Sequence, residues 1–226
     1  MVLDEMNEEV DRDVGLEEAR IARDERVNAK SDADQFIPVL EDVVRALHEI
    51  PFCVLGGVAS AAYGRPRLTK DIDVFVRRED AERALAGLTE FGFETEHTNP
   101  SWIFKGFRDG VLVDVIFKVK SDVYFDDEMA ARVRTAEYAG VEIPVLSPED
   151  LVVTKAIAAE EEAPWHWYDA LGVLAVNELD WEYLHERARK SPNRVLSLLH
   201  FAQSIDLPVP ASAVRCLHDL IASRWD

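Results

Sequence analysis

The pattern of apolar residues changes at Leu146, and this change constrains the fold more than any other feature of the chain. Between Phe36 and Leu146, short apolar runs alternate with segments in which apolar residues recur at helical spacing. After Leu146 there are helical patterns and no convincing strand. The chain is therefore predicted to be an α/β (α+β) protein, in which a small mixed β-sheet with flanking helices precedes a C-terminal bundle of about four helices.

Three regions follow from this pattern. Residues 1–34 carry 12 acidic and 5 basic side chains and are expected to form a charged N-terminal extension, either a solvated helix or disordered chain. Residues 35–146 are expected to form the core. Residues 147–226 are expected to form a helical region packed on that core, because no flexible linker separates the two.

The individual elements are predicted from periodicity and from turn and capping signals. Strands are expected over residues 51–55, 71–76, 102–107, 110–119 and 141–146, and helices over residues 36–49, 58–64, 79–93 and 126–136. Asp109-Gly110 is a hairpin signal between two of the strands. Ser147 and Pro148 predict the N-cap and first residue of the first C-terminal helix.

Charge and composition exclude several classes of protein. The formal net charge of −19 argues against nucleic-acid binding over the whole surface, although a local basic patch is compatible with it. Two cysteines are too few for a disulfide framework or a four-thiolate zinc site. No apolar run reaches the roughly 20 residues of a membrane helix, and the acidic N-terminus does not resemble a signal peptide. A cytoplasmic protein without a membrane partner is expected.

Three aspartates are the first candidates for chemistry. Asp71 and Asp73 are two residues apart in a predicted strand, so their side chains share one face. Asp114 interrupts the apolar run VLVDVIF, where an unpartnered carboxylate would be costly. Together they predict a catalytic site that holds Mg²⁺ or Mn²⁺, since these ions prefer oxygen ligands. The alternatives are a solvated strand end for Asp71 and Asp73 and a structural salt bridge for Asp114.

A glycine pair lies between a predicted strand and a predicted helix. Gly56 and Gly57 would let the phosphates of a ligand approach the backbone, and Ser60 could add a hydroxyl from the first turn of the helix. The alternative is a tight strand-to-helix turn without a ligand. Neither G-x-x-x-x-G-K-[ST] nor G-x-G-x-x-G is present.

Basic residues concentrate between the glycine pair and the aspartates. Arg65, Arg67, Lys70, Arg77 and Arg78 give a net charge of +3 over residues 65–78, against Asp71 and Asp73. This charge fits a site for polyphosphate or for the end of a nucleic acid. A solvated loop is the alternative.

Taken in this order, these motifs resemble those of a known superfamily. LGGVAS, then DIDVFV, then the single aspartate of VLVDVIF resemble the nucleotidyltransferase superfamily of DNA polymerase beta, over roughly residues 50–120. LSPEDLVVTKAIA followed by WYDALGVL is similar to the minimal nucleotidyltransferases and the abortive-infection toxin nucleotidyltransferases. In those proteins a helical lysine precedes a basic-Asp-x-x-Asp stretch. Lys155 matches the lysine and Asp169 the second aspartate, whereas Trp165 and His166 depart from the pattern.

The resemblance implies a metal-dependent enzyme that moves a nucleoside monophosphate from an NTP such as ATP to a hydroxyl or phosphate acceptor. Asp71, Asp73 and Asp114 would be the catalytic and metal-binding residues. The candidate nucleotide-binding residues are Gly56, Gly57, Ser60, Arg65, Thr69, Lys70, Lys155 and Asp169. A solvated helix lysine and a helix-surface charge are the alternatives for Lys155 and Asp169.

The acceptor is left open by the sequence. The resemblance implies RNA or tRNA, a protein hydroxyl, or a small molecule such as an antibiotic, and the toxin-like C-terminal region favours RNA or protein in a toxin-antitoxin pair. A cognate antitoxin or toxin protein would then be a partner. The alternative function is a non-catalytic module that binds a nucleotide or a partner protein as an antitoxin or regulator.

Overall fold

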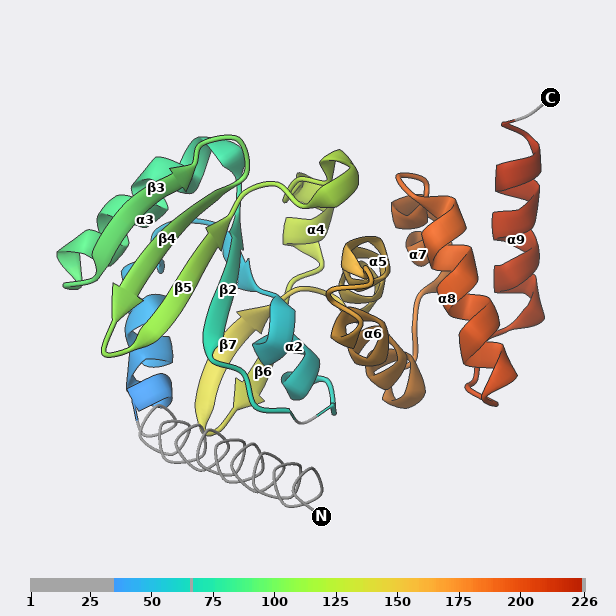
Figure 1. The fold of residues 1–226 in the computed structure, drawn as a ribbon, viewed down its shortest axis with the longest axis horizontal. Coiled ribbons are helices and arrows are strands. Elements are labelled where there is room, and N and C mark those ends of the chain that lie inside the picture. Colours follow the sequence, from blue (N-terminus) through green and yellow to red (C-terminus); the bar gives the residue numbers. More distant parts are fainter. Residues whose placement is uncertain (1–34, 66, 225–226) are drawn as a thin grey trace, which may run out of the picture.

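The computed structural model of the chain describes residues 35–65 and 67–224, and its layout is drawn in Figure 1. The charged N-terminal extension predicted for residues 1–34 lies outside the described residues. The sheet is mixed and seven-stranded, in the order β3-β4-β5-β2-β1-β7-β6. Its strands are β1 (Phe52–Val54), β2 (Asp71–Val76), β3 (Glu94–Asn99), β4 (Ile103–Arg108), β5 (Val111–Ile116), β6 (Arg134–Tyr138) and β7 (Val141–Val145).

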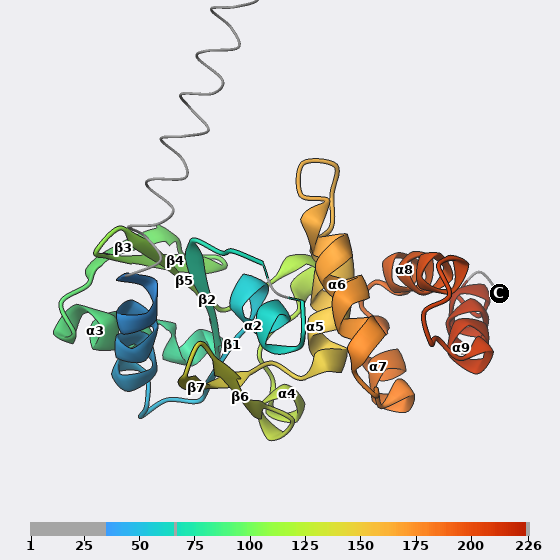
Figure 2. The ribbon, with the colours of Figure 1, turned by 90° about the horizontal axis from the view of Figure 1, so that it is seen from below.

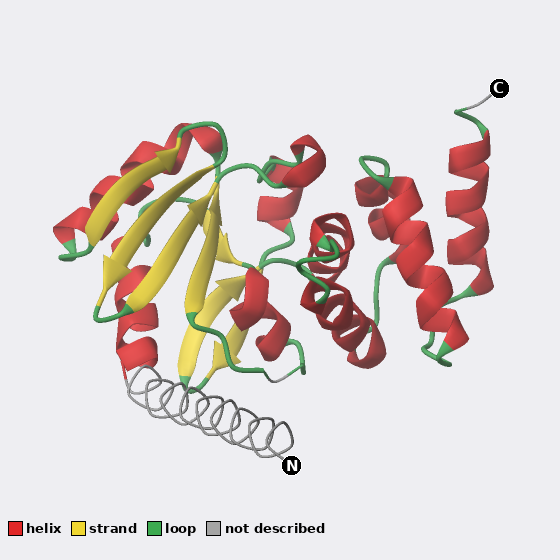
Figure 3. Ribbon diagram, viewed as in Figure 1, coloured by secondary structure: helices red, strands yellow, loops and turns green. Residues whose placement is uncertain are grey.

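Helices joined by loops flank the sheet and form the C-terminal part of the described chain (Figure 3). They are a helix over residues 35–46, α2 (Gly56–Ala62), α3 (Ala81–Glu90), α4 (Asp127–Ala131), α5 (Pro148–Ala158), α6 (Trp165–Val176), α7 (Trp181–Ala188), α8 (Pro192–Ser204) and α9 (Ala211–Ala222). Short 3₁₀ turns are formed by Arg78–Asp80 and Lys120–Asp122. The α/β class, the mixed sheet and the helical C-terminal region are confirmed, with five helices after Leu146 in the described residues instead of about four.

The two faces of the sheet are covered differently. The helix of residues 35–46 and α3 lie behind the sheet in Figure 1, whereas α2 lies in front of it. Ile72, Val74 and Val76 of β2 are fully buried in the apolar core. Gly87 of α3 allows the two rear helices to approach closely, because a Cβ there would lie 2.7 Å from the Ala46 carbonyl oxygen.

Two segments of the core differ from prediction. The helix expected over residues 126–136 is wrong beyond Ala131, because Arg134–Tyr138 forms β6 and pairs antiparallel with β7. This pairing overrides the helix-forming tendency of the local residues. The segment Glu94–Asn99 was not predicted as a strand, yet it forms the edge strand β3 beside β4.

The C-terminal helices extend away from the sheet, and α5 is the one nearest to it, as Figure 2 shows. Ser147 is the N-cap of α5, because its side chain accepts a hydrogen bond from the Asp150 backbone N–H, and Pro148 occupies the first turn, as predicted. No helix among residues 35–65 and 67–224 is both long and apolar enough to cross a membrane.

Candidate active site

The parallel pairing of β2 and β5 brings two of the predicted aspartates together. Asp73 and Asp114 are direct register partners, so their side chains leave the sheet on the same face. Asp71 lies two residues before Asp73 on β2 and therefore points to that face as well. This face is the one covered by α2, since an added Cβ on Gly56 would meet the Asp73 side chain.

Asp73 lies in an unfavourable electrostatic environment. Burial, followed by the negative charges of Asp71 and Asp114, raises the pKa of the Asp73 carboxyl to about 7. Lys155 and Arg67 act in the opposite direction but do not cancel these effects. A carboxylate held among carboxylates in this way is stabilised by a cation.

The other two aspartates each have a partner within the chain. The Lys105 ammonium lies 2.7 Å from Asp114 Oδ1, so the structural salt bridge considered for Asp114 is present. The Thr69 hydroxyl donates to Asp71 Oδ1 at 2.6 Å. Within the part of the chain that the structure describes, no group of three or more His, Cys, Asp or Glu side chains is arranged to hold a metal ion.

The glycine pair makes a close approach between α2 and β2. Gly56 has a φ of +66°, and a Cβ there would lie 1.7 Å from Asp73 Oδ2, so the Asp73 carboxylate occupies the space that any larger residue would need. A Cβ on Gly57 would lie 2.6 Å from Thr69 Oγ1 and 2.9 Å from Arg67 Nη2. The Ser60 hydroxyl is buried and donates to the Gly56 carbonyl oxygen at 2.8 Å, so it stabilises the turn.

Asp169 is surrounded by cations. Its carboxylate accepts hydrogen bonds from Lys155 at 2.9 Å and from Arg67 at 3.1 and 3.2 Å, and Arg65 lies 3.5 Å away. We call these four residues the Asp169 cluster. Lys155 is 3% exposed and Asp169 is not exposed, so a solvated lysine and a helix-surface charge are wrong for these positions.

The electrostatics of the Asp169 cluster are opposite to those of Asp73. Burial alone would raise the pKa of Asp169, but the charges and hydrogen bonds of Lys155 and Arg67 hold it below its usual value. Burial lowers the pKa of Lys155, and the Asp169 and Asp73 carboxylates oppose that shift. The cluster therefore places paired cations close to Asp73.

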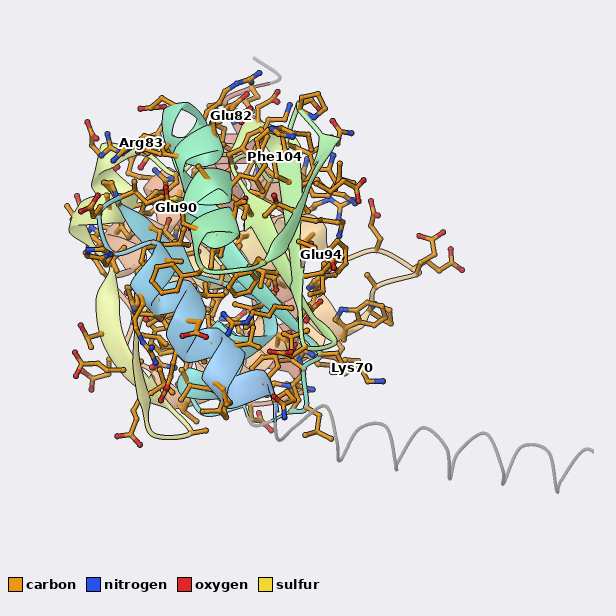
Figure 4. The ribbon with its side chains drawn as sticks, turned by 90° about the vertical axis from the view of Figure 1, so that its left-hand side faces the viewer. Lys70, Glu82, Arg83, Glu90, Glu94 and Phe104 are labelled. Carbon is orange, nitrogen blue, oxygen red and sulfur yellow. The ribbon has the colours of Figure 1, made fainter. Side chains whose placement is uncertain are left out.

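The basic residues of the 65–78 segment do not form one patch. Arg65 donates to the Tyr168 carbonyl oxygen and stacks over the Tyr168 ring. Lys70 is exposed and lies at the periphery of the molecule (Figure 4). Arg77 pairs with Asp127 at 2.5 Å. The predicted basic patch is thus divided between the Asp169 cluster, the solvent and the start of α4.

A cavity of about 580 Å³ opens beside these residues. Of the predicted site residues, Gly56, Asp73, Asp114 and Lys155 line it. His166 also lines the cavity, with further residues that the sequence analysis did not single out for binding, among them Trp102, Lys118, Lys120, Thr154 and Glu160. Most of the remaining wall is apolar, and the cavity volume is in the range of sites for small organic ligands.

His166 is held neutral at the cavity wall. Burial, followed by the Lys155 charge, lowers the pKa of His166 to about 4, and its Nδ1 lies 3.4 Å from Lys155 Nζ. The sequence analysis noted His166 as a departure from the family pattern and did not place it beside Lys155. It also missed Lys105 and the contact of Arg67 with Asp169, which depend on strand register and on a loop-to-helix contact.

A family model described as "Uncharacterised nucleotidyltransferase" matches residues 17–204. Among curated proteins, none matches the sequence.

Three of the solved structures that are similar to the chain each have a TM-score below 0.5. The solution structure of the antibiotic-resistance factor ANT(2'')-Ia is 19% identical with a TM-score of 0.49, over 86% of this chain and 94% of that one. A nucleotidyltransferase-like antigenic protein from Paracoccidioides brasiliensis is 19% identical with a TM-score of 0.49, over 80% and 91%. The lincosamide antibiotic adenylyltransferase LnuA is 12% identical with a TM-score of 0.43, over 65% and 96%.

Proposed function

Since the chain belongs to the nucleotidyltransferase family whose model matches residues 17–204, we propose that its cavity is where a nucleoside monophosphate passes from an NTP to an acceptor. The acceptor oxygen attacks the α-phosphorus, the bond from that phosphorus to the bridging oxygen of pyrophosphate breaks, and the acceptor loses a proton. The observation that carries this proposal is Asp73, whose carboxyl has a pKa raised to about 7 beside Asp71 and Asp114 in a ligand-sized cavity.

We propose that Asp71 and Asp73 hold Mg²⁺ or Mn²⁺. Their oxygen donors match the preference of these ions, and the electrostatic repulsion at Asp73 is the kind that a bound cation relieves. The ion would supply charge neutralisation for the phosphates. Asp114, whose Oδ1 is held by Lys105, would present its other carboxylate oxygen on the acceptor side and accept the proton of the attacking hydroxyl.

The nucleotide would bind along α2 and the Asp169 cluster. The backbone N–H groups at Gly56 and Gly57 are proposed to contact the β- and γ-phosphates, with Lys155 adding a positive charge. Supporting roles are proposed for the other candidates. Ser60 stabilises the glycine turn, and Thr69 orients Asp71. Arg65 and Arg67 fix Asp169 within the cluster. Lys70, which is exposed and outside the cavity lining, would reach only a part of the ligand that extends beyond the cavity. Catalysis would rest on positioning and charge neutralisation.

For the acceptor we favour RNA, including tRNA, or a protein hydroxyl, with the enzyme as the toxin of a toxin-antitoxin pair in the cytoplasm. Trp102, 40% exposed at the cavity, offers a surface on which a base or an aromatic side chain could stack. Lys118, Lys120 and Lys155 line the same cavity together with Asp73, Asp114 and Glu160, so the charged groups of the lining balance and do not select for a polycationic acceptor such as an aminoglycoside.

A small-molecule acceptor is the second candidate, and the observation that favours it is the volume of the cavity, about 580 Å³. A lincosamide, with a single basic amine, would suit the apolar wall better than a polycationic aminoglycoside would. A protein that only binds a nucleotide or a partner, as an antitoxin or regulator, would not need the three aspartates for catalysis.

The test is incubation with each α-labelled NTP and Mg²⁺, together with total RNA, total protein or a lincosamide antibiotic. We expect label in RNA or protein from the wild type and none from Asp73→Asn. Asp127→Asn is the matched control, because Asp127 is an exposed aspartate on α4, 88% exposed at its side chain. Tight NTP binding without transfer to any acceptor or release of pyrophosphate would contradict the proposal and favour the binding module.

A further inference from the structure

Lys105 is fixed opposite Asp114 by the β4–β5 hairpin. The two-residue turn Asp109-Gly110 joins antiparallel strands in which Lys105 and Asp114 are direct register partners. Both side chains leave the sheet on one face, and the ammonium lies 2.7 Å from the carboxylate oxygen. Their side chains are 25% and 15% exposed, so the pair is largely shielded from water.

A row of three charges therefore crosses the sheet. On neighbouring strands β4, β5 and β2, Lys105 faces Asp114, and Asp114 faces Asp73. Asp114 has its cation within the chain, whereas Asp73 has no ion pair to another described residue. Lys155, a cavity-lining cation near Asp73, is instead bound to Asp169.

This row bears on how many metal ions the site can hold. A second divalent ion bridging Asp73 and Asp114 would have to displace Lys105 from Asp114 or lie beside its ammonium, and like charges at such short range repel strongly. The same pairing agrees with the lack, among the described residues, of any three-ligand group arranged for a metal. Asp71 and Asp73 are not obstructed by a lysine in this way.

We propose that Lys105 is a built-in cation that takes the place of a second metal ion, so that the resting site binds one divalent ion through Asp71 and Asp73. The inference rests on the proposed function, because it presumes a divalent ion at these aspartates. Lys105 is a positioning residue in this account. It holds the Asp114 carboxylate in place and restricts its use as a metal ligand.

The experiment is an equilibrium titration of the full chain with Mn²⁺ alone, in which free Mn²⁺ is counted by electron paramagnetic resonance. We expect one ion per chain for the wild type and a second ion for Lys105→Met, bound at least about tenfold more tightly than any second ion of the wild type. Lys105→Gln keeps a hydrogen-bond donor for Asp114 while removing the charge, and it should behave like Lys105→Met even if the latter folds poorly.

Two further variants test whether the second ion depends on the pairing of Lys105 with Asp114. Lys118→Met is the matched control, because Lys118 lines the same cavity but pairs with Asp122 instead of Asp114; it should bind one ion, as the wild type does. Adding Asp114→Asn to Lys105→Gln should abolish the second ion.

The outcomes separate this inference from the function on which it rests. Two ions in the wild type, or one ion in the wild type and in both Lys105 variants, would overturn the role of Lys105 and leave the proposed metal site intact. No bound Mn²⁺ in any protein would contradict the metal site itself, and the inference would fall with it.

Discussion

Asp73 and Asp169 both lie near Lys155 and have opposite surroundings. Asp73 stands among carboxylates, which together with burial raise the pKa of its side chain to about 7. Asp169 is contacted by Lys155, Arg65 and Arg67, and its pKa is held below the usual value. Asp73 is therefore suited to attract a cation from outside the chain, whereas Asp169 holds cationic side chains of the chain in place.

This difference predicts that Asp73 serves ligand binding and that Asp169 serves the stability of the fold. Charges of one sign that are gathered without partners lower the stability of a folded chain and are expected where a ligand supplies the missing charge. A buried carboxylate whose partners are all within the chain stabilises the arrangement, and removing it leaves those partners unpaired. Mutation of the two aspartates should therefore have different consequences.

The largest effect is expected for Asp73→Asn on activity. The amide cannot carry the negative charge proposed to hold the metal ion, so nucleotidyl transfer should fall by at least about 10³-fold. Initial rates of pyrophosphate release with Mg²⁺ and NTP would measure this. An activity within a few-fold of that of the Asp127→Asn control would contradict the proposed difference between Asp73 and Asp169, because Asp73 would then have no special role in the reaction.

Asp169→Asn should act on stability. Lys155 is buried and Arg67 half-buried, and loss of their shared carboxylate leaves both cations uncompensated, which typically costs about 3–5 kcal/mol in the free energy of unfolding. Urea denaturation followed by circular dichroism is the measurement. A free energy of unfolding equal to that of the wild type would show that the Asp169 cluster is not an anchor.

Gly56→Ala should disturb Asp73 directly. The φ of +66° adds backbone strain of about 1–3 kcal/mol, and the new Cβ would meet Asp73 Oδ2. Gly92→Ala is the matched control, because Gly92 has a φ of +83° and nothing within 4 Å of its Cβ position. Both variants should lose stability in urea denaturation, but only Gly56→Ala should lose activity; equal activity in the two would contradict the close approach.

The smallest effect is a pH dependence of stability without metal. The folded chain holds a proton on Asp73 up to about pH 7, whereas the unfolded chain releases it near the ordinary value of 3.8. Between these values the folded state binds more protons, so the contribution of Asp73 to stability rises as pH falls. Melting temperatures of wild type minus Asp73→Asn should increase from pH 7 to pH 5, and a decrease would refute the raised pKa.

The sequence predicted the parts of the molecule that depend on local pattern. The alternation in DIDVFV predicted β2 and placed Asp71 and Asp73 on one face, and Ser147 predicted the start of α5. Polar or helix-forming segments such as Glu94–Asn99 and Arg134–Tyr138 could not be identified as strands, because their pairing partners determine their conformation.

The contacts at the candidate site that the sequence did not predict also depend on residues far apart in the chain. That Lys155 and Asp169 are buried against Arg67 depends on contacts between a loop and two helices, which one sequence does not reveal. Lys105 is different, because the Asp109-Gly110 turn already implies that the residues four before and four after it lie opposite each other. Applying the hairpin register to the sequence would have found the partner of Asp114.

The most direct test of the account is the melting temperature of wild type, Asp73→Asn and Asp169→Asn with and without Mg²⁺ at pH 8. Without Mg²⁺, Asp73→Asn should melt at or above the wild-type temperature and Asp169→Asn well below it. With Mg²⁺, the wild type should gain stability by binding the ion and Asp73→Asn should not. A wild type that does not respond to Mg²⁺, or an Asp73→Asn variant that melts as low as Asp169→Asn, would contradict the division between a cation-binding and a cation-anchoring aspartate.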